Sequence, residues 1–131
     1  VAPIVSVRKH SGLMVPAPVQ HAMAVALHDT EHVERQRSVY AARRTLLLDA
    51  LTEAGLDVDP DTAAGLYLWV DPANPSDSWA LVDRLAGLGI LVAPGDFYGT
   101  AAHGRVRVAL TATDERVAAA AERIREAWNA R

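Results

Sequence analysis

The residues best suited to binding chemistry lie in the stretch 89–110, which reads G-I-L-V-A-P-G-D-F-Y-G-T-A-A-H-G-R-V-R-V-A-L. The Pro-Gly pair at 94–95 predicts a sharp turn, since proline fixes its own φ and glycine adopts angles closed to other residues. Such a turn places Phe97 and Tyr98 on a loop held between two strands, where side chains are free to contact a ligand. Arg107 follows inside the second strand, and its guanidinium offers a planar fork that matches a carboxylate. These residues indicate a carboxylate-binding site and define no reaction.

Two arginines, Arg105 and Arg107, alternate with Val106, Val108 and Leu110, so strand geometry places both arginines on one face. Two interpretations stay open. The alternation by itself favours a solvent-facing row on a half-buried sheet. The other interpretation is that one arginine binds an anionic ligand, which spacing alone cannot show.

Composition limits the classes of partner. The chain has 131 residues and a formal net charge of −3, so it carries no general excess of basic residues for nucleic acid. No apolar run approaches the roughly 20 residues needed to cross a bilayer. We therefore expect neither nucleic acid nor a membrane as partner, and a cytoplasmic location. The chain opens on Val1 in apolar sequence without a methionine, which indicates a portion of a longer protein.

Metal chemistry finds no support in the sequence. The chain has no cysteine, which excludes disulfides, thiolate nucleophiles and cysteine zinc ligands. His28 and His32 are four residues apart, but the Asp29-Thr30 pair between them is typical of a helix start and separates the two side chains. We therefore predict no metal site.

The first 28 residues predict short elements broken by prolines. A helical piece over 6–10 is followed by an extended segment over 13–19, because each residue before a proline is pushed out of the α region. The alanine-rich sequence at 20–27 favours another short helix.

A long amphipathic helix follows, starting at the cap pair Asp29-Thr30 and ending at Gly55. Its apolar stripe consists of Val33, Tyr40, Leu47, Leu51 and Ala54.

After this helix we predict a strand over 66–71 with a short partner at 57–58, followed by a turn at Asn74-Pro75-Ser76. A helix comes next, and its apolar face consists of Trp79, Val82, Leu85 and Ala86. The two strands of 89–110 follow, and then a last helix capped by Thr113, whose apolar face consists of Val117, Ala121, Ile124 and Trp128. The connections are too short for parallel strand–helix–strand units throughout. We predict an α/β chain, α+β-like in its small domain, with a mixed, largely antiparallel small sheet and helices mainly on one face.

Four segments in this order resemble the C-terminal portion of a class I/II, fold-type-I pyridoxal-phosphate aminotransferase. The resemblance covers nearly all of the chain. The sequences of these segments are most similar to those of N-succinyldiaminopimelate aminotransferases of the diaminopimelate and lysine pathway. The segments are R-K-H-S-G-L-M-V-P-A-P-V-Q from Arg8, A-G-L-Y-L-W-V from Ala64, G-I-L-V-A-P-G-D-F-Y-G from Gly89 and R-V-R-V-A-L-T-A-T from Arg105.

The resemblance implies roles for individual residues. Arg107 occupies the position of the arginine that grips the substrate α-carboxylate, and a bidentate charge-assisted pair would fix the orientation of the amino acid. The remaining implied substrate-binding residues are those of the glycine-aromatic turn, Gly65, Leu66 and Tyr67, and those of the loop at the site mouth, Phe97 and Tyr98.

The resemblance also implies a pyridoxal 5'-phosphate cofactor, held as a Schiff base on a lysine. Lys9 is the chain's one lysine and aligns downstream of the family's S-x-S-K motif, so the catalytic lysine is expected upstream of residue 1. Residues 1–28 then correspond to the end of the large domain and residues 29–131 to the small domain. The 131 residues alone are expected to be inactive, without a catalytic residue of their own.

For the whole protein the resemblance implies a homodimer acting on amino acid and 2-oxo acid substrates, namely N-succinyl-LL-2,6-diaminopimelate and 2-oxoglutarate. Two alternatives remain. One is another amino-acid aminotransferase of the same fold, with aspartate or aromatic substrates. The other is a non-catalytic α+β module that binds a carboxylate through the arginine and the aromatic loop.

Overall fold

The computed structural model describes residues 1–72 and 78–129, and the chain forms two units, Val1–Gln36 and Arg37–Arg131. The predicted turn at Asn74-Pro75-Ser76 lies outside the described residues. The predicted domain boundary after residue 28 stays a prediction.

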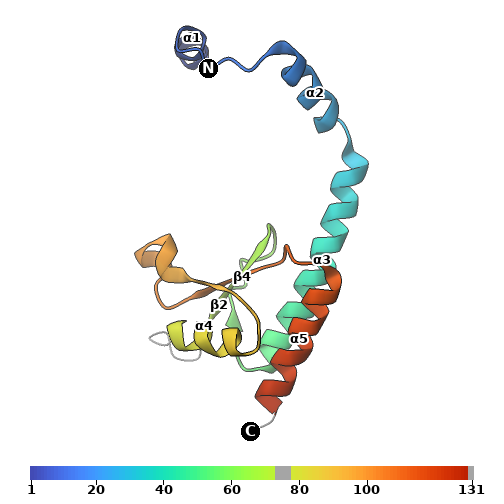
Figure 1. Ribbon diagram of the computed structural model, residues 1–131, viewed down its shortest axis with the longest axis vertical. Helices are drawn as coiled ribbons and strands as arrows, with labels where there is room; N and C mark the ends of the chain where they lie inside the picture. The colour runs from blue at the N-terminus through green and yellow to red at the C-terminus, as the bar shows by residue number, and fades with distance from the viewer. Residues whose placement is uncertain (73–77, 130–131) are drawn as a thin grey trace. The chain divides into compact units, whose positions relative to one another are not determined.

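The first unit contains two short helices, α1 (Ala2–His10) and α2 (Ala17–Leu27), followed by the first turns of a third helix (Figure 1). The prediction of an extended segment over 13–19 is wrong from residue 17 onward. Pro18 lies in the first turn of α2, as Pro3 does in α1, where the backbone N–H has no partner within the helix to lose. The prolines therefore start these helices instead of breaking them.

Helix α3 (Thr30–Glu53) has the predicted boundaries. The Asp29 carboxylate accepts a hydrogen bond from the backbone N–H of His32 at 3.2 Å, which caps the helix and lowers the pKa of Asp29. Gly55 follows the helix with φ of +72°, a conformation that glycine adopts without strain.

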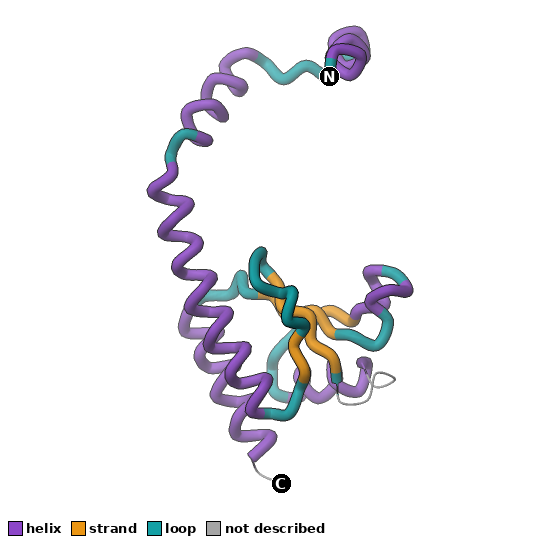
Figure 2. The backbone as a smooth tube through the Cα atoms, turned by 180° about the vertical axis from the view of Figure 1, so that it is seen from behind, coloured by secondary structure: helices purple, strands orange, loops and turns teal. Residues whose placement is uncertain are grey.

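A four-stranded sheet forms the centre of the second unit (Figure 2). Its strand order is β1 (Asp57–Val58), β2 (Tyr67–Asp71), β4 (Val106–Ala109) and β3 (Ala93–Pro94), and all three neighbouring pairs are antiparallel. The predicted small, largely antiparallel sheet is confirmed. The strand expected after Gly89 is shorter than predicted, because only Ala93 and Pro94 pair with β4.

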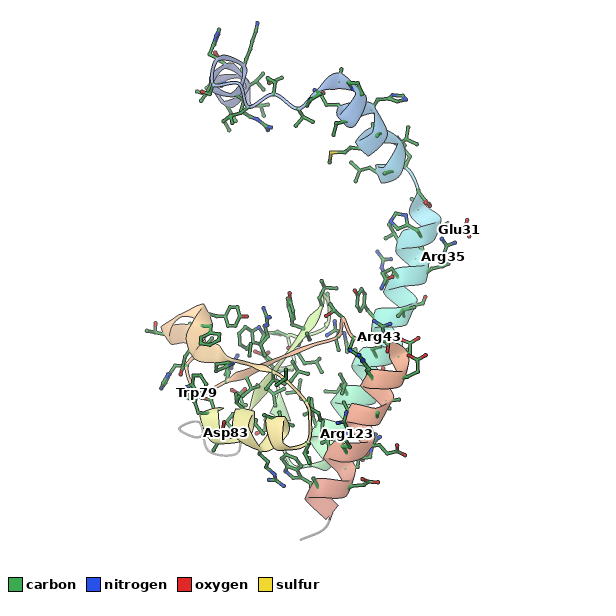
Figure 3. The ribbon with its side chains drawn as sticks, in the orientation of Figure 1. Glu31, Arg35, Arg43, Trp79, Asp83 and Arg123 are labelled. Atoms are coloured by element: carbon green, nitrogen blue, oxygen red, sulfur yellow. The ribbon has the colours of Figure 1, made fainter. Side chains whose placement is uncertain are left out.

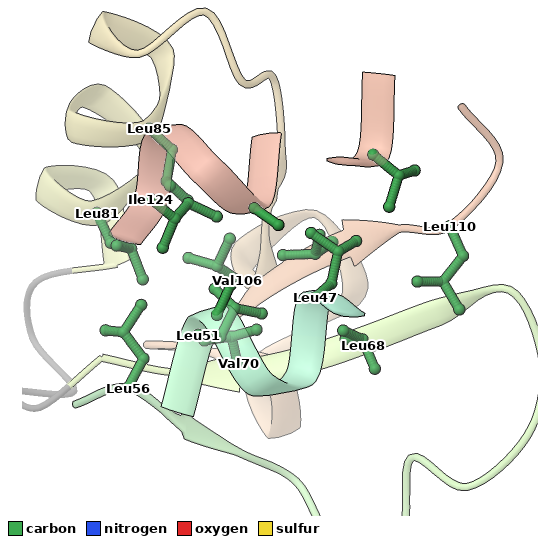
Figure 4. Close-up of a cluster of buried hydrophobic side chains, with 14 residues drawn as sticks. Leu47, Leu51, Leu56, Leu68, Val70, Leu81, Leu85, Val106, Leu110 and Ile124 are labelled. Atoms are coloured by element: carbon green, nitrogen blue, oxygen red, sulfur yellow. The ribbon is translucent and has the colours of Figure 1, made fainter. Parts of the chain in front are cut away.

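One face of the sheet is buried beneath three helices: the second half of α3, α4 (Ser78–Gly87) and α5 (Asp114–Asn129). Their apolar side chains meet those of β2 and β4 in a single core (Figure 4), which confirms that the helices pack on one face. The core comprises Leu47, Ala50, Leu51, Leu56, Leu68, Val70, Leu81, Leu85, Val106, Val108, Leu110, Val117, Ala121 and Ile124.

Helix α4 departs from the predicted apolar face. Leu81 and Leu85 are buried, whereas Trp79 is 50% exposed. The reason is local, because the indole N–H of Trp79 is hydrogen-bonded to a carboxylate outside the core.

Helix α5 runs beside α3 and in the same direction (Figures 1 and 2). Arg43 on α3 binds Asp114 at the start of α5 with an Nε–Oδ1 distance of 2.6 Å, and Arg125 binds Glu53 near the C-terminal ends with an Nε–Oε2 distance of 2.6 Å. Arg43 also donates to the carbonyl of Leu110 at 3.1 Å, which ties the end of β4 to α3. Among the described residues, no helix is both long and apolar enough to cross a membrane.

Candidate functional site

The sheet face opposite the core carries the polar and aromatic side chains of β2 and β4. Side chains alternate between the faces of a strand, so burial of Leu68 and Val70 turns Tyr67 and Trp69 the other way. The register pairs Trp69 with Arg107, which makes the arginine a direct neighbour of the aromatic residues.

Arg105 is fully engaged by carboxylates. Its Nη1 lies 2.7 Å from Oδ2 of Asp59, and its Nε lies 2.9 Å from Oδ1 of Asp71. The pKa of Asp59 is lowered, first by the backbone N–H of Asp61 and then by the hydrogen bond from Arg105. Arg105 therefore joins β4 to β1 and β2 and has its charge compensated within the fold.

Arg107 is held differently. Its Cζ lies 4.0 Å from the ring centroid of Tyr67 and 4.6 Å from that of Tyr98, within the range of cation–π contact. Within the described residues its Nε is buried and has no hydrogen-bond partner. A buried donor without an acceptor costs about 1–3 kcal/mol, which an incoming acceptor offsets. Stacking on rings uses the flat sides of a guanidinium and leaves its edge of N–H donors for a planar, bidentate acceptor such as a carboxylate.

The loop between β3 and β4 brings Tyr98 to this site. It consists of two 3-10 turns, η2 (Gly95–Tyr98) and η3 (Thr100–Ala102), and the ring of Tyr98 meets that of Trp69 edge-on at 5.4 Å. Phe97, on the same loop, contacts helix α4. It is 71% exposed and meets the ring of Trp79 at 6.1 Å.

The predicted glycine-aromatic turn contributes mainly through its backbone. Arg44 on α3 donates to the carbonyl of Gly65 at 2.8 Å and to that of Thr62, and the carbonyl of Leu66 accepts from the N–H of Leu110 at 2.8 Å. These bonds fix the start of β2, so that the next residue, Tyr67, meets Arg107. Thus Arg107, Tyr67 and Tyr98 converge, Gly65 and Leu66 support Tyr67 through the main chain, and Phe97 lies against α4.

A second network, which sequence reasoning missed, surrounds Asp96. Its Oδ2 accepts from the indole N–H of Trp79 at 2.8 Å, and its Oδ1 lies 2.7 Å from Nδ1 of His103 (Figure 3 labels Trp79). The pKa of Asp96 is lowered, first by the bond from Trp79 and then by that from His103. Trp79 lies 17 residues before Asp96 and His103 seven residues after it, and no spacing rule connects them.

Two cavities accompany these features. One of about 230 Å³ adjoins the sheet face opposite the core, called the aromatic face below, and is lined by the 59–66 segment together with Tyr67 and Trp69. The other, of about 400 Å³, lies on the helical side among α3, α5 and residues 89–92, with mostly apolar walls. Among its described lining residues the larger cavity has no unpaired buried donor, whereas the Nε of Arg107 and the hydroxyl of Thr62, which lines the smaller cavity, are buried without a partner. We therefore place the candidate site on the aromatic face.

Comparison with known proteins places the chain in a family. Residues 6–124 match the family model "Aminotransferase class I and II". The chain is 55% identical over 121 residues to 4-dedimethylamino-4-oxo-anhydrotetracycline transaminase OxyQ of Streptomyces rimosus, covering 92% of this chain and 33% of that protein. The chain thus spans about a third of the length of this curated relative.

Two solved structures agree with this placement. The aspartate aminotransferase from Thermus thermophilus with maleate superposes with a TM-score of 0.74 at 30% identity, over 92% of this chain and 32% of that one. A "probable N-succinyldiaminopimelate aminotransferase", also from Thermus thermophilus, gives a TM-score of 0.65 at 35% identity, over 76% of this chain and 27% of that one.

The fold is that of fold-type-I aminotransferase domains. The chain belongs to the class I and II aminotransferase family. Enzymes of this family depend on pyridoxal phosphate, which acts as an electron sink for carbanions. Lys9, the chain's one lysine, is exposed on α1, and the side chains that contact Arg107, those of Tyr67 and Tyr98, offer no amine for a Schiff base.

Proposed function

We propose that this chain supplies the substrate-carboxylate site of a longer pyridoxal-phosphate aminotransferase, with Arg107 as the carboxylate-binding residue. The observation that carries the proposal is the contrast between Arg107 in β4 and Arg105 just before that strand. Arg105 has its charge compensated by Asp59 and Asp71, while Arg107 rests on aromatic rings with a buried, unpaired Nε.

The residues of this chain would bind and orient the substrate. The edge of Arg107 would hold both oxygens of the α-carboxylate, and Tyr67 and Tyr98 would hold the orientation of the planar guanidinium and partly shield it from water. Fixing the carboxylate restricts rotation of the substrate about its α-carbon, and such positioning lowers the barrier of the following chemistry. No described residue of the site offers the amine that this chemistry needs, so the chain alone would not turn over substrate.

For the intact protein we propose transfer of an amino group between N-succinyl-LL-2,6-diaminopimelate and 2-oxoglutarate, as a homodimer. Support comes from the similar structure described as a "probable N-succinyldiaminopimelate aminotransferase" and from the maleate, a dicarboxylate, of the Thermus relative. The Streptomyces relative is named for transamination of 4-dedimethylamino-4-oxo-anhydrotetracycline, so other substrates are the alternatives to test.

The carboxylate site is tested by binding of 2-oxoglutarate to the 131-residue chain, followed by NMR titration. We expect Arg107→Lys to weaken binding by at least about tenfold, because a lysine offers no bidentate fork and the lost charge-assisted bond contributes roughly 1.5–3 kcal/mol. Arg105→Lys is the matched control, the same change two residues earlier in the chain, and should leave the affinity within about twofold, within the about 0.5 kcal/mol typical of changes away from a site. Equal effects of the two substitutions would refute the assignment to Arg107.

The substrate is tested on the intact gene product. We expect the largest kcat/KM with N-succinyl-LL-2,6-diaminopimelate as donor, and a preference for aspartate or an aromatic amino acid would establish the alternative instead. Turnover by the isolated 131 residues that disappears in Lys9→Ala would contradict the proposal that this chain holds no catalytic lysine.

A further inference from the structure

We propose that Asp96 is a positioning residue for the carboxylate site: its side chain fastens the loop that carries Tyr98 to helix α4 and so keeps Tyr98 over Arg107. This inference rests on the proposed function, since it concerns the same arginine. Asp96 acts through Tyr98, two residues further along the loop.

The loop has few attachments of its own. At its base the N–H of Gly95 donates to the carbonyl of Arg105 at 2.7 Å, and Gly99, with φ of +95°, separates η2 from η3. No residue from 96 to 103 belongs to the buried core. A segment without buried apolar side chains keeps its position only through polar or ring contacts.

The Asp96 carboxylate supplies two of these contacts at once. One oxygen binds the indole N–H of Trp79 in the first turn of α4, and the other binds Nδ1 of His103 at the far end of the loop. An ionised carboxylate only accepts hydrogen bonds, so Nδ1 of His103 carries a proton. Because α4 buries Leu81 and Leu85 in the core, the bond to Trp79 attaches the loop to a rigid element, and the bond to His103 joins the two ends of the loop to each other.

Tyr98 depends on this attachment for its place. Its side chain is 44% exposed, so burial does not hold it, and its ring touches Trp69 only edge-on. If the loop separates from α4, Tyr98 loses its position beside Arg107, while Tyr67, which is part of β2, keeps its own. The site would retain its arginine and lose one of the two rings that orient it.

The test uses the full 131-residue chain labelled with ¹⁵N, in which the Nε–H resonance of Arg107 reports the site. Two variants cut the attachment: Asp96→Asn weakens the acceptor, and Trp79→Phe removes the indole donor but keeps a ring. Asp83→Asn, the same charge change on an exposed residue of α4, is the control. In both variants we expect the Arg107 resonance to shift and the affinity for 2-oxoglutarate to fall about two- to fivefold, the value of one exposed cation–π contact.

The outcomes separate this inference from the proposed function. A wild-type chain that binds no 2-oxoglutarate refutes the carboxylate site, while the Arg107 resonance still reports whether Asp96 positions Tyr98. If neither the resonance nor the affinity in the two variants differs from that in Asp83→Asn, Asp96 has no positioning role. Should Asp96→Asn fail to fold, Trp79→Phe decides the question by the same two readouts.

Discussion

Gly95 is the position where the structure leaves the least room for a side chain. A Cβ on this residue would lie 2.8 Å from the carbonyl oxygen of Arg105 and would press directly on the carbonyl of Ala102. Both neighbours are backbone atoms, which cannot rotate away as a flexible side chain can. Gly95→Ala must therefore push η2 away from Ala102 of η3 and from Arg105.

The magnitude follows from two losses. Overpacking of a close-packed site costs about 1–3 kcal/mol. The displaced backbone also gives up the hydrogen bond from Gly95 to Arg105, now 2.7 Å long, which contributes about 1 kcal/mol. We therefore expect Gly95→Ala to lower the free energy of unfolding by about 2–4 kcal/mol.

Urea unfolding of the 131-residue chain, followed by tryptophan fluorescence, measures this change, since all three tryptophans lie beyond residue 36, in the second unit. Gly87→Ala is the matched control, because its Cβ would meet nothing within 4 Å and its φ is not positive. That substitution should change the free energy of unfolding by no more than about 0.5 kcal/mol. A Gly95→Ala chain as stable as the Gly87→Ala chain would refute the close packing of η2.

Two further predictions concern the supports of the site. Arg44→Met, which keeps the aliphatic length of the side chain, should remove the bonds to the carbonyls of the 62–65 turn and lower the free energy of unfolding by about 1–3 kcal/mol, checked by the same urea titration, and an unchanged midpoint would contradict it. Acid should detach the Asp96 loop. The pKa of Asp96 is lowered in the fold, so its stabilising contribution is fully present above the ordinary aspartate range and is lost as the pH falls below about 4. Stability measured against pH should show this loss in the wild-type chain and a smaller one in Asp96→Asn, and equal profiles would contradict it.

The elements that local sequence rules govern were predictable. Asp29 and Gly55 mark the ends of α3 as capping chemistry requires, and the alternation around Arg107 places the valines of β4 in the core. Pro18 misled the prediction, because a proline that forbids a helix interior also starts a helix well, and only the tertiary context decides which applies.

The site itself was predictable only in part. Arg105 and Arg107 look alike in the sequence, and their difference comes from the carboxylates of Asp59, just after β1, and Asp71, at the end of β2. Residue spacing does not show which acidic side chains the sheet brings beside which arginine. For the same reason the Asp96 network was missed, since its donors come from a helix before the loop and from the end of the loop.

The way the 95–105 loop is joined at its base has an evolutionary consequence. The loop is joined to the sheet at its base through Gly95 and Arg105 and contributes no side chain from 96 to 103 to the core. Substitutions at exposed positions of this loop such as Thr100 and Ala101 can alter the mouth of the site with little effect on the stability of the scaffold. Descendants of one ancestral chain can thus acquire new amino donors through this loop while their folding remains as it was.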